Sequence, residues 1–178
     1  MAASDDPELH VPLSKKIALA RLFTRIPLLG RLWARTVPIA ENSEVPWTPM
    51  RKPLASSSIC LITTGSLHLK SDSRFNMDDP EGDPSFRAIP ASAAHDDLTI
   101  THDYYDHTDA DRDFNIVFPL DRVRELAAGH LGGLTPTHYS FMGHITGRHV
   151  STLEREILQQ LIARLSAESP HFVFLTPA

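Results

Sequence analysis

The segment from His102 to Asp113, HDYYDHTDADRD, holds the densest set of chemically useful side chains in this sequence. Within twelve residues it places two histidines, five aspartates, two tyrosines and one arginine. Histidine is the side chain best suited to move protons near neutral pH, and a flanking carboxylate sets its tautomer and its charge. The composition therefore indicates acid–base chemistry by His102 and His107, or binding of a polar ligand.

The same segment contains residue types that bind metals, and it also has a plainer interpretation. His102 and Asp106 are four residues apart, so a helix would place them on one face. The spacing matches neither an HExxH motif nor an EF-hand loop, and we therefore expect no metal site. A structural role stays open as well, because Arg112 lies between two aspartates and arginine forms bidentate pairs with carboxylates.

Further candidates follow the apolar run that starts at Ser58, SICLITTGSLHL. Residues 59–62 are continuously apolar, as in a strand that is buried on both faces, and TTG then ends the run. Ligands commonly bind at the carboxyl edge of a parallel sheet, where such a strand enters its loop. We expect the ligand-binding residues of this edge to include Thr64, Gly65, His68 and His138, with Tyr139 and His144 in the same crevice.

A lone histidine such as His68 more often has a structural role, and that alternative stays open. Cys60 lies inside the apolar run, where a cysteine behaves as a small hydrophobic residue rather than a nucleophile. The glycine spacing after the run is not a GxGxxG fingerprint, so the sequence predicts no dinucleotide cofactor.

The elements that must position these residues follow from the hydrophobic periodicity. Residues 71–113 form a long polar loop in which DLTITH predicts a short strand. FPLDRVRELAAGHLGG predicts a helix that begins near Pro119 and ends by Gly132. THYSFMGH predicts a short strand or turn, and STLEREILQQLIARLSAES predicts a longer helix that Ser151 and Glu154 start as a capping box. HFVFLT predicts a second buried strand.

This order of elements predicts an α/β fold, a partial doubly wound (Rossmann-like) parallel sheet with a long polar loop. Residues 1–45 form an N-terminal extension and linker, and residues 46–178 form the domain. An amphipathic helix with a basic face is expected over residues 14–36. Such a helix either packs on its own domain or docks on a partner or a membrane surface.

The bulk composition narrows the class of protein. The net charge of −5 argues against a nucleic-acid partner, and a single cysteine rules out an intrachain disulfide framework. The first ten residues are acidic and carry no apolar segment, so they do not form a secretory signal, and no apolar stretch is long enough to span a membrane. We therefore expect a cytoplasmic protein without membrane association.

Three stretches together carry a family resemblance. They are LITTGSLHLK, DPEGDPSFRAIP with THDYYDHTDADRDFNIVFPLDRVRELA, and HYSFMGHI. In combination they resemble the glycine/sarcosine/betaine and D-proline reductase family, in particular its selenoprotein B-type subunits. The resemblance covers roughly residues 46–178 and leaves the N-terminal helix outside it.

The resemblance implies a cytosolic oxidoreductase that cleaves a carbon–nitrogen bond in a small amine or amino acid. It implies a dithiol or thioredoxin-like protein as electron donor, and other reductase subunits as partners. On this basis His102, Asp106 and His107 are expected to contact the substrate or to donate a proton to the leaving amine. The residues expected to bind the substrate are Thr64, Gly65, His68, Asp109, Arg112 and His138.

The sequence departs from the family at the redox pair. The family's selenocysteine or cysteine, followed closely by a cysteine, is absent from these residues, and in relatives it comes directly after a strand resembling FVFLTPA. We expect a selenocysteine, encoded by UGA, just after Ala178 in a full-length product, so that the given chain is truncated and inactive. The alternative is a redox-inactive binding or regulatory paralogue that keeps only ligand or partner binding.

Overall fold

The computed structural model describes residues 48–178 together with residues 26, 28, 31, 32 and 35. The chain divides into two compact units, one made of residues 1–40 and 104–106, the other of residues 41–103 and 107–178. The helix predicted over residues 14–36, and the linker up to residue 45, lie almost entirely outside the described residues. All strands considered below belong to the second unit.

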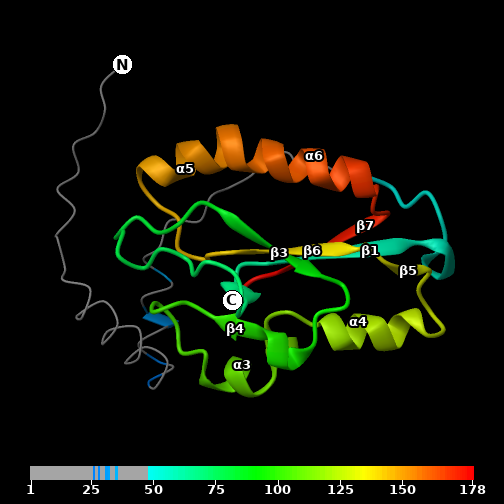
Figure 1. Cartoon of the computed structure of the whole chain (residues 1–178), viewed down its shortest axis with the longest axis horizontal. Helices are drawn as coiled ribbons and strands as arrows, with labels where there is room; N and C mark the ends of the chain where they lie inside the picture. Colours follow the sequence, from blue (N-terminus) through cyan, green and yellow to red (C-terminus); the bar gives the residue numbers. More distant parts are fainter. Residues whose placement is uncertain (1–25, 27, 29–30, 33–34, 36–47) are drawn as a thin grey trace. The chain divides into compact units, whose positions relative to one another are not determined.

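The second unit holds a five-stranded sheet and a separate two-stranded sheet (Figure 1). In chain order the elements are η1 (Leu54–Ser56), β1 (Ser58–Thr63), β2 (Leu67–Leu69), β3 (Phe86–Pro90), η2 (His95–Asp97), β4 (Leu98–Ile100), α3 (Thr108–Arg112), η3 (Phe114–Ile116), α4 (Leu120–Ala127), β5 (Gly133–Leu134), β6 (Thr137–Phe141), α5 (Arg148–Thr152), η4 (Leu153–Ile157), α6 (Leu158–Glu168) and β7 (Phe172–Thr176).

Strand β1 is the centre of the larger sheet. It pairs in parallel with β5 near its start, with β6 near its end, and with β7 along most of its length. Because β7 takes one edge of β1, β5 and β6 must share the other. The α/β class predicted from the sequence is confirmed, as is the buried strand from Ser58, although a doubly wound Rossmann topology is not established by this strand order.

The sheet is mixed: the pairings of β1 are parallel, as the sequence predicted, and one further pairing is antiparallel. Strand β3 pairs with β6 in the antiparallel direction, with Ala88 opposite Tyr139. This strand comes from the region predicted as a polar loop, where Phe86 and Ile89 recur too briefly to signal a strand. Strand β4, which was predicted, pairs with β2 in the antiparallel direction and buries Leu98 and Ile100.

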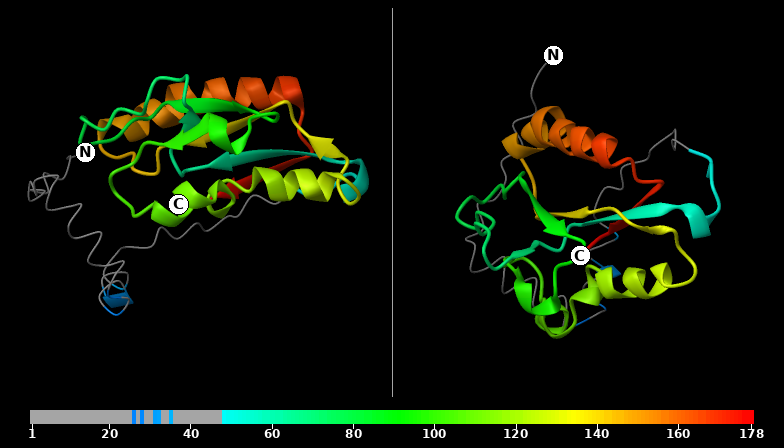
Figure 2. Two further views of the ribbon diagram at one scale, coloured as in Figure 1. Left: turned by 60° about the horizontal axis from the view of Figure 1, so that its bottom comes forward. Right: turned by 45° about the vertical axis from the view of Figure 1, so that its right-hand side comes forward.

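Helices cover both faces of the larger sheet. Figures 1 and 2 show α5 and α6 across one face, with α3, α4 and the small β2–β4 sheet on the other. Under α6 lies a hydrophobic core built from Cys60, Ile62, Tyr139, Phe141 and Leu161. Burial of such apolar side chains contributes roughly 25 cal/mol per Å² removed from water and is the main force that holds the layers together.

Two expectations about the chain after β6 need correction. The long helix begins at Arg148, with Gly147 before it at φ 54°, so Ser151 lies inside the helix and forms no capping box with Glu154. Strand β7 forms as predicted but is not buried, since Val173, Phe174 and Leu175 are all exposed. An apolar strand sequence fixes the strand, whereas its burial depends on which neighbours the tertiary structure supplies.

Candidate functional site

The carboxyl ends of β1, β6 and β7 meet at one edge of the sheet because these strands run parallel through β1. The Thr64 N–H donates to the carbonyl oxygen of Thr176, and the Ala178 N–H donates to Thr64 Oγ1, each over 3.1 Å. From the β6 side, an added Cβ on Gly143 would lie 3.0 Å from the Thr64 carbonyl oxygen. We name Thr64, His102, Gly143, His144 and Ala178 the carboxyl-edge site.

A tight turn after β1 connects this edge to the His102 segment. The Gly65 N–H donates to Thr63 Oγ1, and Ser66 takes a left-handed conformation with φ 56°. The Ser66 carbonyl oxygen then accepts the N–H of Thr101 over 3.1 Å. The residue before His102 is thus fixed to the turn, and His102 is placed against the ends of β1 and β6.

His102 is the buried base of the carboxyl-edge site, with 6% of its surface exposed. Its Nε2 lies 3.7 Å from the position that a Cβ on Gly143 would occupy. Burial first, and then electrostatic repulsion from His144 and His107, lowers the pKa of His102 to about 4. At neutral pH the ring is therefore uncharged, so that it offers one N–H donor and one acceptor nitrogen.

His107 carries a carboxylate partner. His107 directly precedes α3, and its Nδ1 lies 2.7 Å from Oδ2 of Asp111, one helical turn further along; both side chains are partly exposed. This contact requires a proton on Nδ1 and holds the imidazole in one orientation. A histidine oriented by a carboxylate is the arrangement that proton transfer needs.

Asp109 and Arg112 lie further out and pair with each other. Their 2.9 Å ion pair is on the protein surface, with about three-quarters or more of each side chain exposed. The sequence placed Arg112 against its neighbouring aspartates, whereas helical spacing in α3 brings it to Asp109 instead. Asp106 belongs to the other compact unit, so it is described apart from this site.

His68 and His138 are buried inside the domain. The Nδ1 of His68 contacts the Leu69 carbonyl oxygen, and its Nε2 contacts Thr101 Oγ1 over 2.8 Å. His138 accepts the Leu61 N–H on Nδ1. His68 therefore holds the residue that precedes His102, and His138 holds the centre of β1.

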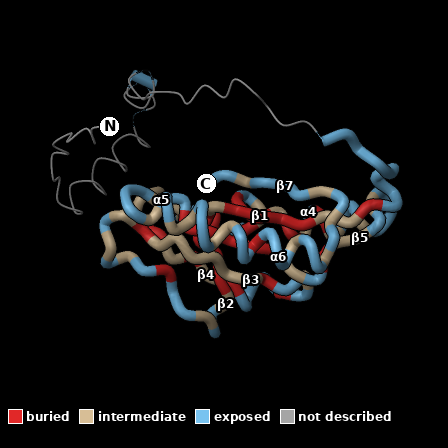
Figure 3. Tube along the Cα trace, turned by 90° about the horizontal axis from the view of Figure 1, so that it is seen from above, coloured by how far each residue is buried: buried red, intermediate tan, exposed pale blue. Residues whose placement is uncertain are grey.

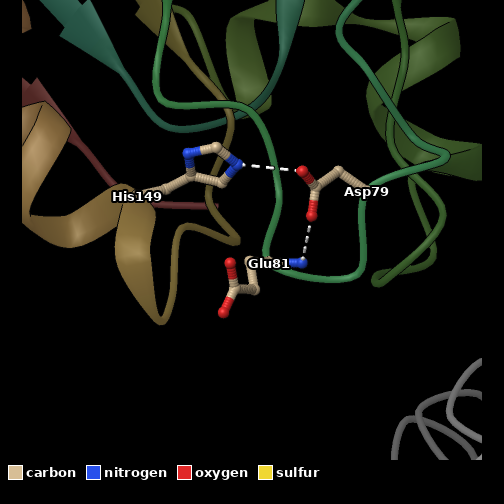
Figure 4. A group of neighbouring side chains, drawn as sticks. All are labelled: Asp79, Glu81 and His149. Carbon is tan, nitrogen blue, oxygen red and sulfur yellow. Dashed lines mark hydrogen bonds and ion pairs between the residues drawn. The ribbon is translucent and has the colours of Figure 1, made fainter.

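A group that the sequence analysis missed supports His144. Asp79, Glu81 and His149 place one ligand atom each within 4.8 Å of one another (Figure 4). Asp79 accepts the Glu81 N–H and lies 3.0 Å from His149 Nε2, while Arg148 pairs with both carboxylates. His149 and the two carboxylates are side chains of the types that bind metals, but both carboxylates already form ion pairs with the Arg148 guanidinium.

The acidic loop and the start of α5 are joined by this ion-pair network. The same loop binds the carboxyl-edge site, because the Pro80 carbonyl oxygen lies 2.9 Å from His144 Nε2, and Gly82 forms a β-bridge with Ile145. No sequence signal links His149 with Asp79, which is 70 positions away; the string DPEGD, which is rich in turn-forming residues, could at most have indicated the loop.

Cys60 is buried and takes no part in the site. Its thiol lies among the core residues under α6, and burial raises its pKa to about 11. A protonated thiol is a poor nucleophile, and this confirms the expectation that Cys60 acts as a small hydrophobic residue.

Among the described residues, no helix is both long enough and apolar enough to cross a membrane.

Comparison with known proteins places the chain in a family. Residues 16–169 match the model of the glycine/sarcosine/betaine reductase selenoprotein B family. Over 131 residues the chain is 36% identical to the D-proline reductase subunit gamma of Acetoanaerobium sticklandii, a match that covers 73% of this chain and 52% of the relative. The chain thus spans about half the length of that curated relative.

No solved structure matches the chain. The family match extends over most of the sequence and includes Thr64, His102, Gly143 and His144 of the carboxyl-edge site, whereas Ala178 lies beyond it. The match begins at residue 16, so it also includes most of the predicted N-terminal helix, which the resemblance had left outside. The chain belongs to the glycine/sarcosine/betaine reductase selenoprotein B family.

Proposed function

We propose that this reductase-family subunit binds a small amine or amino acid at its carboxyl-edge site, for reductive cleavage of a carbon–nitrogen bond. The observation that carries the proposal is the position of His102, a buried and uncharged imidazole beside Thr64 and Gly143 where three parallel strands end. Thr64 is half-buried and Gly143 exposed, so a small ligand reaches this edge from solvent.

The reaction consumes two electrons and two protons. A dithiol is oxidised to a disulfide, the carbon–nitrogen bond breaks, and carbon and nitrogen each gain a hydrogen. His102 and His107 bind the substrate or donate the proton to the leaving amine, and the Asp111 carboxylate orients His107 for that step. The electron donor is a small dithiol or a thioredoxin-like protein, in the reducing cytoplasm, and further reductase subunits are partners.

Charged and uncharged residues together bind the substrate. Asp109 and Arg112 form an exposed pair that matches the ammonium and carboxylate groups of an amino acid. Thr64 and Gly65 supply a hydroxyl group and close backbone approach at the strand end. His68 and His138, both buried, act on the substrate through the segments that they hold.

The redox group of this reaction does not come from the 178 residues themselves. Their single cysteine, Cys60, is buried and has a raised pKa. We propose a selenocysteine close after Ala178 in a full-length product, followed by a cysteine. A selenol is ionised at neutral pH, whereas a free thiol with a pKa of about 8.5 is mostly protonated.

The same property of Cys60 favours a second candidate function. A chain with no reactive thiol among its 178 residues serves equally well as a redox-inactive binding or regulatory subunit. The nucleotides after the Ala178 codon distinguish the two candidates. A UGA followed by an open frame with a nearby Cys codon supports the reductase, whereas any other stop, or no frame beyond it, supports the binding subunit.

An activity assay then tests the site. The product of the extended frame is assayed with a small dithiol and glycine, sarcosine, betaine or D-proline in turn. His102→Gln and His107→Gln should each lower kcat/KM about 10²-fold or more, which is the usual contribution of a positioned proton donor. His130→Gln is the matched control, because His130 is exposed beyond α4. Equal activity in all three variants would show that neither His102 nor His107 takes part in the reaction.

A further inference from the structure

Strand β7 leaves one edge of the larger sheet open. It pairs with β1 from Ile59 opposite Phe172 to Thr63 opposite Thr176. Along its other edge it pairs with no strand from the described part of the chain. Alternate backbone N–H and C=O groups of such an edge strand point outward and are ready to pair with another strand.

The two faces of β7 are also uncovered. Val173 and Leu175 lie opposite Cys60 and Ile62, which α6 covers, yet they are 42% and 67% exposed. Phe174 points to the other face and is 48% exposed. The helix layers therefore end over β1, and Figure 3 shows β7 running exposed along the outside of the sheet.

The sequence of β7 is not typical of a solvent-exposed edge strand. Edge strands usually carry charges, prolines or bulges that block pairing, and FVFLT carries none of these. Strands in parallel sheets are normally covered by helices on both faces, and their sequences are therefore continuous apolar runs. The apolar sequence of β7 is therefore typical of a buried strand, whereas its side chains are exposed to solvent.

The size of the relative indicates what covers it. The 131 matched residues are 52% of the D-proline reductase subunit gamma, so nearly half of that protein lies outside the match. We propose that β7 is a docking surface for the part of such a family member that lies outside the match. One strand of that part would pair with the open edge, and its apolar side chains would cover Val173 and Leu175 on one face and Phe174 on the other. The inference does not depend on the reaction proposed above.

A mixing experiment tests the surface. The part of the Acetoanaerobium sticklandii subunit that lies outside the matched 131 residues is produced as a separate chain and added to the 178-residue protein. Hydrogen–deuterium exchange of a peptide covering residues 171–178, molar mass by light scattering, and circular dichroism of the mixture are measured. We expect a one-to-one complex, exchange of the β7 amides slowed at least tenfold, and more secondary structure than in the sum of the two parts.

Substitutions on β7 and on α4 test whether the added chain binds at β7. Phe174→Lys and Leu175→Lys should abolish the complex, because a lysine on an edge strand opposes pairing and apolar cover. Leu126→Lys should leave it intact, since Leu126 is equally exposed but sits on α4, which packs by β5 on the opposite side of β1.

Two results would overturn the proposal. If the added chain is folded by its own circular dichroism, then exchange and circular dichroism that do not change in the mixture would show that β7 is a solvated edge. Slow exchange of β7 in the 178-residue protein alone, with a molar mass twice its 19.8 kDa, would show that a second copy covers the strand instead.

Discussion

The Nδ1 atom of His138 accepts the backbone N–H of Leu61 over 3.1 Å, at the point where the partner of β1 changes from β5 to β6. The imidazole thus takes the place of a missing strand carbonyl. Because Nδ1 is the acceptor, the ring carries its proton on Nε2. That atom is buried and has no hydrogen-bond partner within the described residues. His138 is therefore held neutral in the interior of the domain.

Stability should fall in mild acid through this histidine. Burial, and to a smaller extent the charge of Arg124, lower the pKa of His138 to about 4, against 6.5 in the unfolded chain. Stability from a lowered pKa is complete above pH 6.5 and is lost as the pH falls toward 4, since the unfolded state binds the proton first. The loss is about 2 kcal/mol by pH 5. Urea unfolding between pH 7.5 and 4.5 measures it.

His138→Phe provides the control for that pH dependence. The variant loses an acceptor for the Leu61 N–H, which costs about 1–3 kcal/mol at pH 7, but its stability should change less between pH 7 and pH 5 than that of the parent. His130→Gln, at an exposed position, should keep the parental slope. A parental slope in His138→Phe would refute the assignment to His138.

Gly143→Ala should disturb the carboxyl-edge site. The new methyl group would lie 3.0 Å from the Thr64 carbonyl oxygen and 3.7 Å from His102 Nε2. The backbone or the side chains must shift to relieve this close contact, which should lower the free energy of unfolding by about 1–3 kcal/mol and change the NMR signals of the His102 ring. Gly129→Ala is the control, because nothing lies within 4 Å of an added Cβ there. Similar unfolding midpoints for the two variants would contradict the packing described.

Asp79→Asn should loosen the start of the long helix. The Asp79 carboxylate accepts the Glu81 N–H and contacts His149 and Arg148. The hydrogen bond from His149 is the largest cause of the lowered pKa of Asp79. We expect faster hydrogen exchange in residues 146–152 and around His144, while exchange in α4 stays as in the parent. Asp78→Asn, an exposed neighbour, should change neither region; if it has the same effect, the network is not what joins the loop to α5.

Cys60 should resist alkylation in the folded protein. With a pKa raised to about 11 by burial, the thiol forms almost no thiolate at pH 8, and the core also blocks access. Iodoacetamide at pH 8 should label the native chain at least 100-fold more slowly than the same chain in guanidinium. Rapid labelling of the native protein would show that the Cys60 thiol is reactive and would make it a candidate redox residue.

The sequence by itself determined the local elements and the density of polar residues in the His102 segment. Continuous apolar residues predicted β1, and Pro119 at the start with glycines after the end predicted α4, because such patterns and helix boundary signals are local properties. The same local reasoning identified His102 and His107 as acid–base candidates and Cys60 as a core residue.

Only the tertiary structure decided which of these residues meet. It brought His102 to Thr64 and Gly143 through the turn at Ser66, a contact between segments far apart in the chain. It also formed the antiparallel strand β3 where the sequence had indicated a polar loop, and it left β7 exposed where the sequence had indicated a buried strand. Strand direction, burial and the network around Asp79 depend on long-range pairing and packing, and neither periodicity nor spacing records those.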